Sequence, residues 1–241
     1  MSHEKLLEVI RLKDSAPLTL EPQKTALLVI DMQRYFVEPE HAFAHVLERM
    51  SPGVTAEYFE RMTNTVVPNI QRLQKEFRGR GLPIFYTGTG TCKPNRCDLA
   101  GWLQVFDGVS GMMLGKPVWP AVDEPAWAVH ESVAPAPGEK VVNKTSAGAF
   151  STTELHREFQ ERGIHTLVIA GTSTDVCVTT TARDAADLNY QVIVVEDACT
   201  TLSERMHEES LNAIRLAFGR TRSTEAVVKM IASARQIAAA G

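Results

Sequence analysis

The cysteine at position 177 stands where an α/β protein would place a nucleophile. The apolar run 167–170 predicts a buried strand, residues 171–174 predict a turn, and a helix is expected to begin at Asp175. Cys177 would then lie in the first turn of that helix, where unpaired backbone N–H groups and the helix dipole favour a thiolate. Cysteine is also common as a small buried hydrophobic residue, so this segment alone leaves packing and catalysis equally open.

Two further residues with useful chemistry follow predicted strands directly. Asp31 ends the apolar run 25–30, and Lys144 follows a short strand predicted over residues 139–143. Taken singly, the aspartate can be explained as a cap and the lysine as a solvated surface charge. Together with Cys177 they would supply a thiol, a carboxylate that takes its proton and a cation that steadies the carboxylate. Such a set makes an activated nucleophile.

The order of the predicted elements indicates a single α/β domain. Strands alternate with helices, which predicts one doubly wound, mainly parallel, six-stranded sheet with helices on both faces. The predicted strands are residues 25–30, 82–86, 139–143, 167–170, 191–195 and 220–222. In the strand order 3-2-1-4-5-6 the first and fourth strands are neighbours, and a crevice opens beyond their carboxyl ends. Asp31, Lys144 and Cys177 would all reach that crevice.

The composition is that of an ordinary globular chain. Of its 241 residues, 44% are hydrophobic and 22% are charged, and the net charge is -4. This charge gives no reason to expect nucleic acid or an anionic membrane as a partner, and no apolar stretch is long enough to span a bilayer. Because the four cysteines are too few for a disulfide framework and the first residues are too charged for a signal peptide, we expect a cytoplasmic protein with reduced thiols.

The sequence predicts an N-terminal extension followed by one main domain. Residues 1–24 are expected to form an N-terminal helical extension, and residues 25–241 the main domain, with a long helix over residues 55–80 kinked at Pro68. Apolar residues in the first and last helices favour a homo-oligomer, a dimer or tetramer. Residues 88–138 are rich in Gly and Pro and predict a long loop, a lid or an interface, whose three tryptophans either wall a pocket or pack the loop down.

Motifs for phosphate or metal are incomplete. The Gly-x-Gly at residues 88–90 lacks the third glycine of a dinucleotide fingerprint, and the pair Cys92 and Cys97 lacks the second pair of a zinc site. His41 and His45 are four residues apart, but the glutamate of the H-E-x-x-H motif is missing. We therefore expect no metal and no cofactor, and a small molecule as the partner.

The sequence resembles the isochorismatase-like cysteine hydrolases from about residue 25 to residue 228. The resemblance is carried by Leu-Val-Ile-Asp-Met-Gln at 28–33, Val-Asn-Lys at 142–144, Gly-Ala-Phe at 148–150 and, most specifically, Gly-Thr-Ser-Thr-Asp-Val-Cys-Val at 171–178. It implies that Asp31, Lys144 and Cys177 are the catalytic set and that the Thr172-Ser173 peptide bond is cis. The N–H groups of Ser173 and Cys177 would then point at a developing oxyanion.

Departures from individual branches of that family narrow the expected reaction. Isochorismatases proper lack the nucleophilic cysteine, so Cys177 argues against them. Nicotinamidases carry an Asp and His metal cluster after the second strand, whereas residues 87–91 contain no histidine. The metal-free branch remains, which resembles N-carbamoylsarcosine amidohydrolase, biuret hydrolase and ureidoacrylate amidohydrolase. These resemblances imply that the chain cleaves a C–N bond of a small amide, carbamoyl or ureido compound through a thioester.

The sequence also indicates candidate substrate contacts and leaves two alternative functions open. Residues beside the motifs or in the long loop are candidates for substrate binding: Phe36, Trp102, Phe150 and Thr174. One alternative is a nicotinamidase-like hydrolase. The other is a non-enzymatic redox protein on the same fold, in which Cys177 is a sensor thiol and Cys199 or Cys92 resolves its oxidised form.

Overall fold

A computed structural model describes residues 3–233 and contains one six-stranded sheet. All of its strand pairs are parallel, and the order is β3-β2-β1-β4-β5-β6. The strands are β1 (Thr25–Ile30), β2 (Ile84–Thr89), β3 (Lys140–Lys144), β4 (Thr166–Thr172), β5 (Gln191–Thr200) and β6 (Arg220–Arg222). The predicted fold class and strand order are confirmed; the predicted domain end at residue 241 lies outside the described residues.

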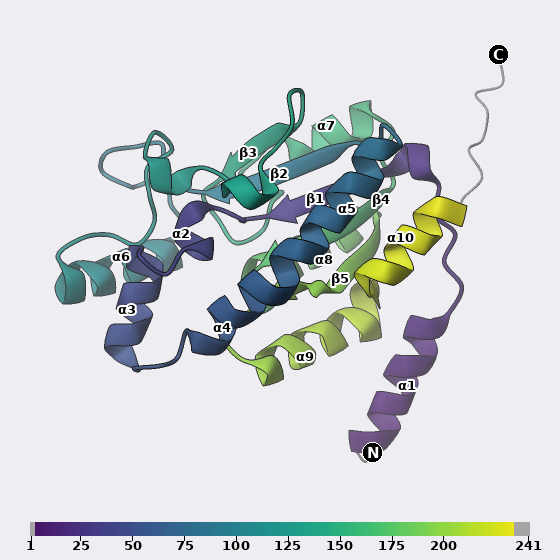
Figure 1. Cartoon of the computed structure of the whole chain (residues 1–241), viewed down its shortest axis with the longest axis horizontal. Helices are drawn as coiled ribbons and strands as arrows, with labels where there is room; N and C mark the ends of the chain where they lie inside the picture. The colour runs from purple at the N-terminus through teal and green to yellow at the C-terminus, as the bar shows by residue number, and fades with distance from the viewer. Residues whose placement is uncertain (1–2, 234–241) are drawn as a thin grey trace.

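Helices cover both faces of this sheet (Figure 1). One face packs against α5 (Val67–Gly79) and α10 (Thr224–Ser233), and the other against α7 (Leu155–Glu161), α8 (Thr179–Asp187) and α9 (Glu204–Ala213). Along β1, Leu27 and Val29 face the first layer, and Leu28 and Ile30 face the second. This double burial explains why the strand is apolar at nearly every position instead of alternating.

Four strands extend further toward their carboxyl ends than their apolar runs indicate. β2 continues to Thr89, β4 to Thr172 and β5 to Thr200, and β3 includes Lys144 as its last residue. The predicted ends are too early because polar residues after an apolar run are typical of turns. These residues are nevertheless buried, and they keep pairing with the neighbouring strand, as Thr89 does with Lys144.

The predicted helix over residues 55–80 is present in three pieces. They are α4 (Ala56–Arg61), a π-helical turn η2 (Met62–Val66) and α5. Pro68 lies in the first turn of α5 and has no N–H, so it cannot continue the regular hydrogen-bond ladder from the preceding turn. The irregular turn therefore directly precedes the proline that predicted the kink.

The segment 88–138 is not a plain loop, contrary to the sequence-based expectation. It contains α6 (Gly101–Leu114) and two short turns, η3 (Pro125–Trp127) and η4 (Glu131–Val133). This helix is not evident from the sequence because α6 contains three glycines, which disfavour helices, and because apolar residues on its exposed side obscure the helical periodicity. Together with α2 (Arg34–Val37) and α3 (Ala42–Met50), α6 forms a group at one end of the sheet (Figure 1).

The predicted N-terminal helix is α1 (His3–Ser15), which packs on the π-helical turn η6 (Ile214–Phe218). Short turns η1 (Pro22–Lys24) and η5 (Thr174–Val178) complete the elements.

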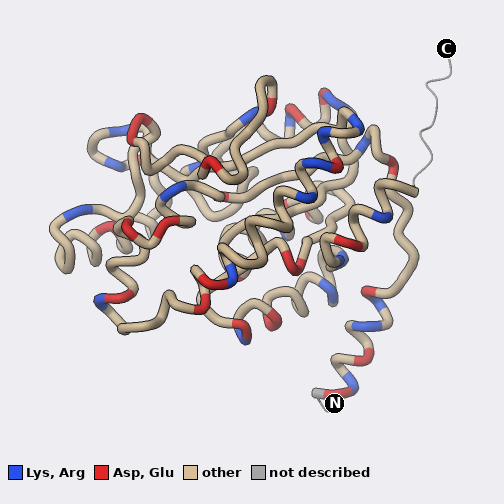
Figure 2. Tube along the Cα trace, in the orientation of Figure 1, with Lys and Arg blue, Asp and Glu red and all other residues tan. Residues whose placement is uncertain are grey.

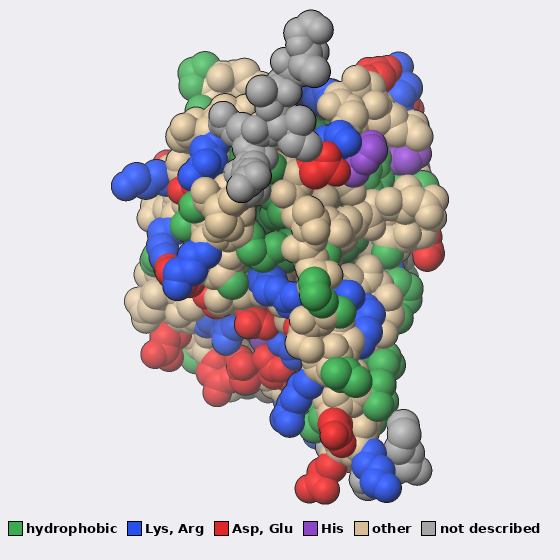
Figure 3. Space-filling model, turned by 90° about the vertical axis from the view of Figure 1, so that its right-hand side faces the viewer, with side chains coloured by type: hydrophobic (Ala, Val, Ile, Leu, Met, Phe, Trp, Pro, Cys, Tyr) green, Lys and Arg blue, Asp and Glu red, His purple; other side chains and the backbone are tan. Residues whose placement is uncertain are grey.

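The surface around α1 carries both charged and apolar side chains. Residues of both charge signs occur along α1 and α5 in Figure 2. Leu12 on α1 is 74% exposed, and Figure 3 shows hydrophobic side chains among charged ones on this side. The expected homo-oligomer stays a prediction. Within residues 3–233, the helices are too short or too polar to cross a membrane.

Candidate active site

Asp31, Lys144 and Cys177 come together at the carboxyl end of the sheet. The Nζ atom of Lys144 lies 2.8 Å from Oδ2 of Asp31 and donates a hydrogen bond to Sγ of Cys177 at 3.5 Å. The side chains of Asp31 and Lys144 are fully buried, and Cys177 is 6% exposed. Three residues that are far apart in the sequence thus form one cluster, at the switch point between β1 and β4.

Each member of the cluster is positioned by the end of a different strand. Asp31 follows β1 with a φ of 51°, a left-handed conformation that aspartate adopts more readily than most residues. Lys144 ends β3, and its side chain reaches past β2 toward β1. Cys177 lies in η5, directly after β4, so it is held in a π-helical turn and not in the regular first turn that its sequence predicts.

Two threonines of β2, which the sequence patterns did not indicate, hydrogen-bond to Asp31, and Thr89 also bonds to Lys144. Thr87 Oγ1 donates to Asp31 Oδ1 at 2.8 Å, and Thr89 Oγ1 donates to Oδ2 at 3.1 Å. Lys144 Nζ donates to Thr89 Oγ1 at 2.7 Å and to the carbonyl of Ser146 at 2.9 Å. The two threonines are two residues apart and therefore face the same side of their strand, a signal that can be used only once β2 is known to extend to Thr89.

The electrostatics of the cluster favour a protonated thiol next to an ammonium group. Burial raises the pKa of Cys177 to about 12, and Asp31 raises it too, whereas Lys144 lowers it. Burial lowers the pKa of Lys144, but the charges of Asp31 and Cys177 outweigh burial and leave that pKa above its ordinary value. The sequence predicts that the helix start favours a Cys177 thiolate, but in the structure burial favours the protonated thiol. The carboxylate of Asp31 is close enough to Cys177 to raise the pKa of the thiol, and a carboxylate is a group that can accept a thiol proton.

A cavity of about 200 Å³ opens beside the cluster. Cys177, Ser173 and Thr89 contribute to its wall. Much of the remaining wall is aromatic: Phe36, Phe43, Trp102, Phe106 and Trp119. A small molecule that entered this space would have access to the cysteine sulfur and would contact mainly apolar side chains.

Of the four predicted substrate contacts, only Phe36 and Trp102 line this cavity. Phe150 instead stacks on Tyr190 at a centroid distance of 5.9 Å, within the core between the sheet and α7. Thr174 is fully buried, and its Oγ1 shares a hydrogen bond with Nδ1 of His207 at 2.8 Å. Contrary to expectation, Phe150 and Thr174 support their neighbours and take no place in the wall.

The backbone between β4 and η5 lies against the cavity. The peptide bond between Thr172 and Ser173 is cis. Thr172 Oγ1 is hydrogen-bonded to the hydroxyl of Tyr58 at 3.0 Å, and the carbonyl of Ser173 accepts the N–H groups of Val176 and Val178, each at 3.1 Å. These bonds fix the conformation of the segment that carries Cys177.

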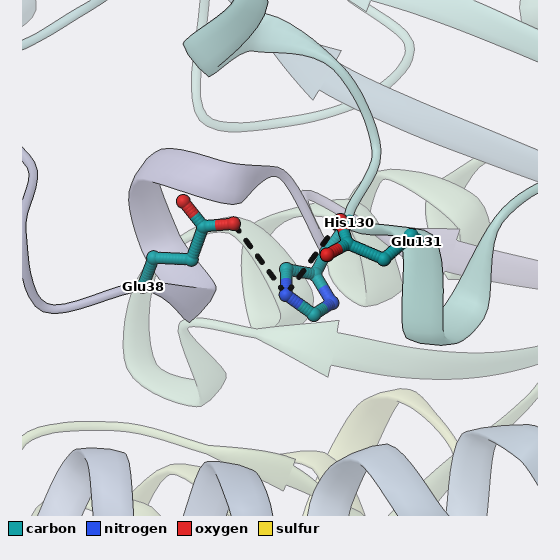
Figure 4. A group of neighbouring side chains, drawn as sticks. All are labelled: Glu38, His130 and Glu131. Atoms are coloured by element: carbon teal, nitrogen blue, oxygen red, sulfur yellow. Dashed lines mark ion pairs between the residues drawn. The ribbon is translucent and has the colours of Figure 1, made fainter.

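Within residues 3–233, one group of potential metal ligands comes close together: Glu38, His130 and Glu131 (Figure 4). His130 Nε2 lies between the two carboxylates, 3.6 Å from Glu38 and 3.9 Å from Glu131. Glu38 is already paired with Arg34 at 3.0 Å and with His41 at 2.8 Å. Because the arginine neutralises the carboxylate that a cation would need, the group is better explained as an ion-pair network that joins η4 to α2.

The chain matches the isochorismatase domain family over residues 25–226. An uncharacterized isochorismatase family protein of Bacillus subtilis is 31% identical over 220 residues, which are 89% of this chain and 97% of that protein. N-carbamoylsarcosine amidase of an Arthrobacter species is 28% identical over 212 residues, 86% and 71% of the two chains. A cysteine hydrolase from Pseudomonas syringae pv. phaseolicola has a crystal structure similar at a TM-score of 0.74 and 26% identity, covering 92% of this chain and 100% of that one.

Proposed function

The chain belongs to the isochorismatase domain family of hydrolases, and on that premise we propose that it is a cysteine-dependent amidohydrolase. Its substrate is a small amide, carbamoyl or ureido compound, and a C–N bond of that compound is cleaved through a thioester. The proposal rests mainly on the buried cluster of Asp31, Lys144 and Cys177 beside a cavity that admits a small molecule. The named amidases among its relatives support the reaction class.

In the first half of the reaction, Asp31 accepts the proton of the Cys177 thiol while the sulfur attacks the carbonyl carbon. Because the pKa of the thiol is raised to about 12, proton transfer accompanies the attack and does not precede it. The backbone N–H groups of Ser173 and Cys177 stabilise the tetrahedral oxyanion. Lys144 stays charged and holds the Asp31 carboxylate in place.

In the second half, Asp31 returns the proton to the leaving nitrogen, and the C–N bond breaks. A primary amide releases ammonia and leaves the acyl group on Sγ. Asp31 then takes a proton from water, the hydroxyl attacks the thioester, and the thiol is restored. The sum is one amide and one water consumed, and one carboxylic acid and one ammonia formed.

The alternative of a redox sensor has weaker support. A sensor cysteine reacts as the thiolate, which burial disfavours here because it raises the pKa of Cys177. Of the two cysteines expected to resolve its oxidised form, Cys92 is exposed and Cys199 is buried, and neither belongs to the cluster. Reversible peroxide oxidation of Cys177 in a protein that turns over no amide would favour the sensor.

Ammonia release from a panel of amides and ureas tests the proposal. Wild-type protein is compared with Cys177→Ala, with iodoacetamide-treated protein and with protein in EDTA. We expect release by the wild type, with or without EDTA, and none after alkylation or in Cys177→Ala. Full activity in Cys177→Ala would reject the nucleophile, and loss of activity in EDTA would favour the nicotinamidase-like alternative.

A further inference from the structure

We propose that this chain selects primary carboxamides whose acyl group is apolar and uncharged, and that it discriminates against acyl groups ending in a carboxylate. The inference rests on the proposed function and narrows its substrate class. The reaction is then that of R–CO–NH₂ with water to give R–COOH and ammonia, where R occupies the aromatic cavity beside Cys177.

The aromatic part of the cavity offers little to a polar group. The ring of Trp119 packs against Trp102 and Phe106, with centroids 6.1 Å and 5.7 Å away. Its indole N–H donates to the carbonyl of Leu103 at 2.8 Å, so this donor is not available to a ligand. Phe36 and Phe43 meet edge to face at 4.8 Å and continue the same wall. A polar atom of R placed against these rings would lose water and gain no partner.

The charges around the cavity disfavour an anion. Among the described residues that line it, none is Arg, Lys or His, and the one charged side chain is Asp175. The carboxylate of Asp175 accepts a hydrogen bond from Thr201 Oγ1 at 2.5 Å. Lys144 is the nearest cation of the cluster, but it is paired with Asp31 at 2.8 Å. A carboxylate on R would therefore be desolvated without a cationic partner and would face a like charge.

The volume of the cavity limits the size of R. An apolar cavity of about 150 Å³ in another protein is known to hold benzene. A cavity of about 200 Å³ therefore suits an acyl group on the order of six to eight non-hydrogen atoms. Branched aliphatic and single-ring aromatic carboxamides fall in this range.

The test compares isocaproamide with succinamate, which have the same number of non-hydrogen atoms. Isocaproamide ends in an isopropyl group, and succinamate ends in a carboxylate. Dissociation constants are measured with Cys177→Ala by quenching of tryptophan fluorescence, so that binding is observed without turnover. We expect isocaproamide to bind at least about 100-fold more tightly. Equal or tighter binding of succinamate, tighter binding of the cationic γ-aminobutyramide, or no binding of isocaproamide up to its solubility would overturn the inference.

A matched pair of variants on α6 locates the selectivity. Phe106 lines the cavity, whereas its neighbour Val105 is 69% exposed and does not. In the Cys177→Ala background, Phe106→Arg is expected to reduce the preference for isocaproamide at least about tenfold by supplying a cation, and Val105→Arg to leave the preference unchanged. Leu47→Arg, at another part of the wall, serves if Phe106→Arg fails to fold. An unchanged preference in the wall variants would place R elsewhere.

Turnover separates this inference from the proposed function. If Cys177→Ala binds isocaproamide selectively but the wild type releases no ammonia from it, the hydrolase proposal fails while the selectivity of the cavity stands. If the wild type hydrolyses succinamate faster than isocaproamide, the hydrolase proposal stands and the inference about R fails.

Discussion

The Nζ atom of Lys144 lies 2.8 Å from Oδ2 of Asp31, and both side chains are fully shielded from solvent. Two opposite charges in such a place are stabilising only as a pair, because each alone would be buried without compensation. The hydroxyls of Thr87 and Thr89 add hydrogen bonds to the carboxylate and complete its partners. The pair is therefore part of the buried core, and it holds the Asp31 carboxylate close to Cys177.

The first prediction concerns that pair. Asp31→Asn or Lys144→Met should each lower the free energy of unfolding by about 3 to 5 kcal/mol, because each leaves the other charge buried and unpaired. The double variant should be more stable than the sum of the two losses predicts. Urea denaturation near neutral pH measures all four proteins. Strict additivity would mean that the two charges do not interact.

The second prediction is a loss of stability at high pH that depends on Cys199. Burial raises the pKa of this thiol from 9.0 to about 12. Below pH 9.0 the thiol is protonated in both the folded and the unfolded protein, so its burial causes no pH-dependent loss of stability. As the pH rises from 9.0 toward 12, the unfolded chain loses the proton before the folded protein does, and the free energy of unfolding therefore falls. In Cys199→Ala the decline should be shallower by up to about 1.4 kcal/mol per pH unit. Identical slopes in urea titrations above pH 9.0 would contradict the burial effect.

The third prediction concerns Gly171, which pairs with Ile30 immediately before Asp31. Its φ is +125°, and a Cβ atom there would lie 2.1 Å from the carbonyl oxygen of Ile30. Gly171→Ala should therefore cost at least about 3 kcal/mol or prevent folding. Gly81→Ala is the control, since its φ is +65° but nothing lies within 4 Å of the added atom; it should cost about 1 to 2 kcal/mol. Similar thermal melts for the two variants would refute the steric account.

The fourth prediction tests the threonine that the sequence did not reveal. Thr89→Val keeps the shape of the side chain but removes the hydroxyl that joins Asp31 to Lys144. We expect kcat to fall by roughly 10- to 100-fold and the free energy of unfolding by about 1 to 3 kcal/mol. Thr63→Val, on the exposed side of η2, should change neither quantity by much. A wild-type kcat in Thr89→Val would show that this bridge does not position the base.

The main outline could be predicted because parallel sheets have few arrangements. Apolar runs located the strands, and the strand order 3-2-1-4-5-6 then required Asp31, Lys144 and Cys177 to meet at one edge. The helix α6 was missed because three of its residues are glycine and its outer side is apolar. Thr87 and Thr89 were missed because polar residues after an apolar run look like a turn. Their burial depends on partners from β1 and β3, which no local pattern contains.

The substrate contacts were harder to predict, for a related physical reason. Phe36 and Phe150 both lie next to characteristic motifs, yet only Phe36 lines the cavity, while Phe150 packs against Tyr190 on the other side of the sheet. Which way an aromatic side chain points depends on the helices that cover each face. Short segments do not hold that information.

The proposed mechanism requires that Cys177 carry the acyl group. Wild-type protein should be mixed with an excess of a carboxamide substrate, quenched in acid and digested, and the peptide containing Cys177 examined by mass spectrometry. We predict that this peptide gains the mass of the acyl group in place of one hydrogen, and that Cys177→Ala gains no such mass and releases no ammonia. An acyl group on another residue, or ammonia release by Cys177→Ala at the wild-type rate, would contradict the mechanism.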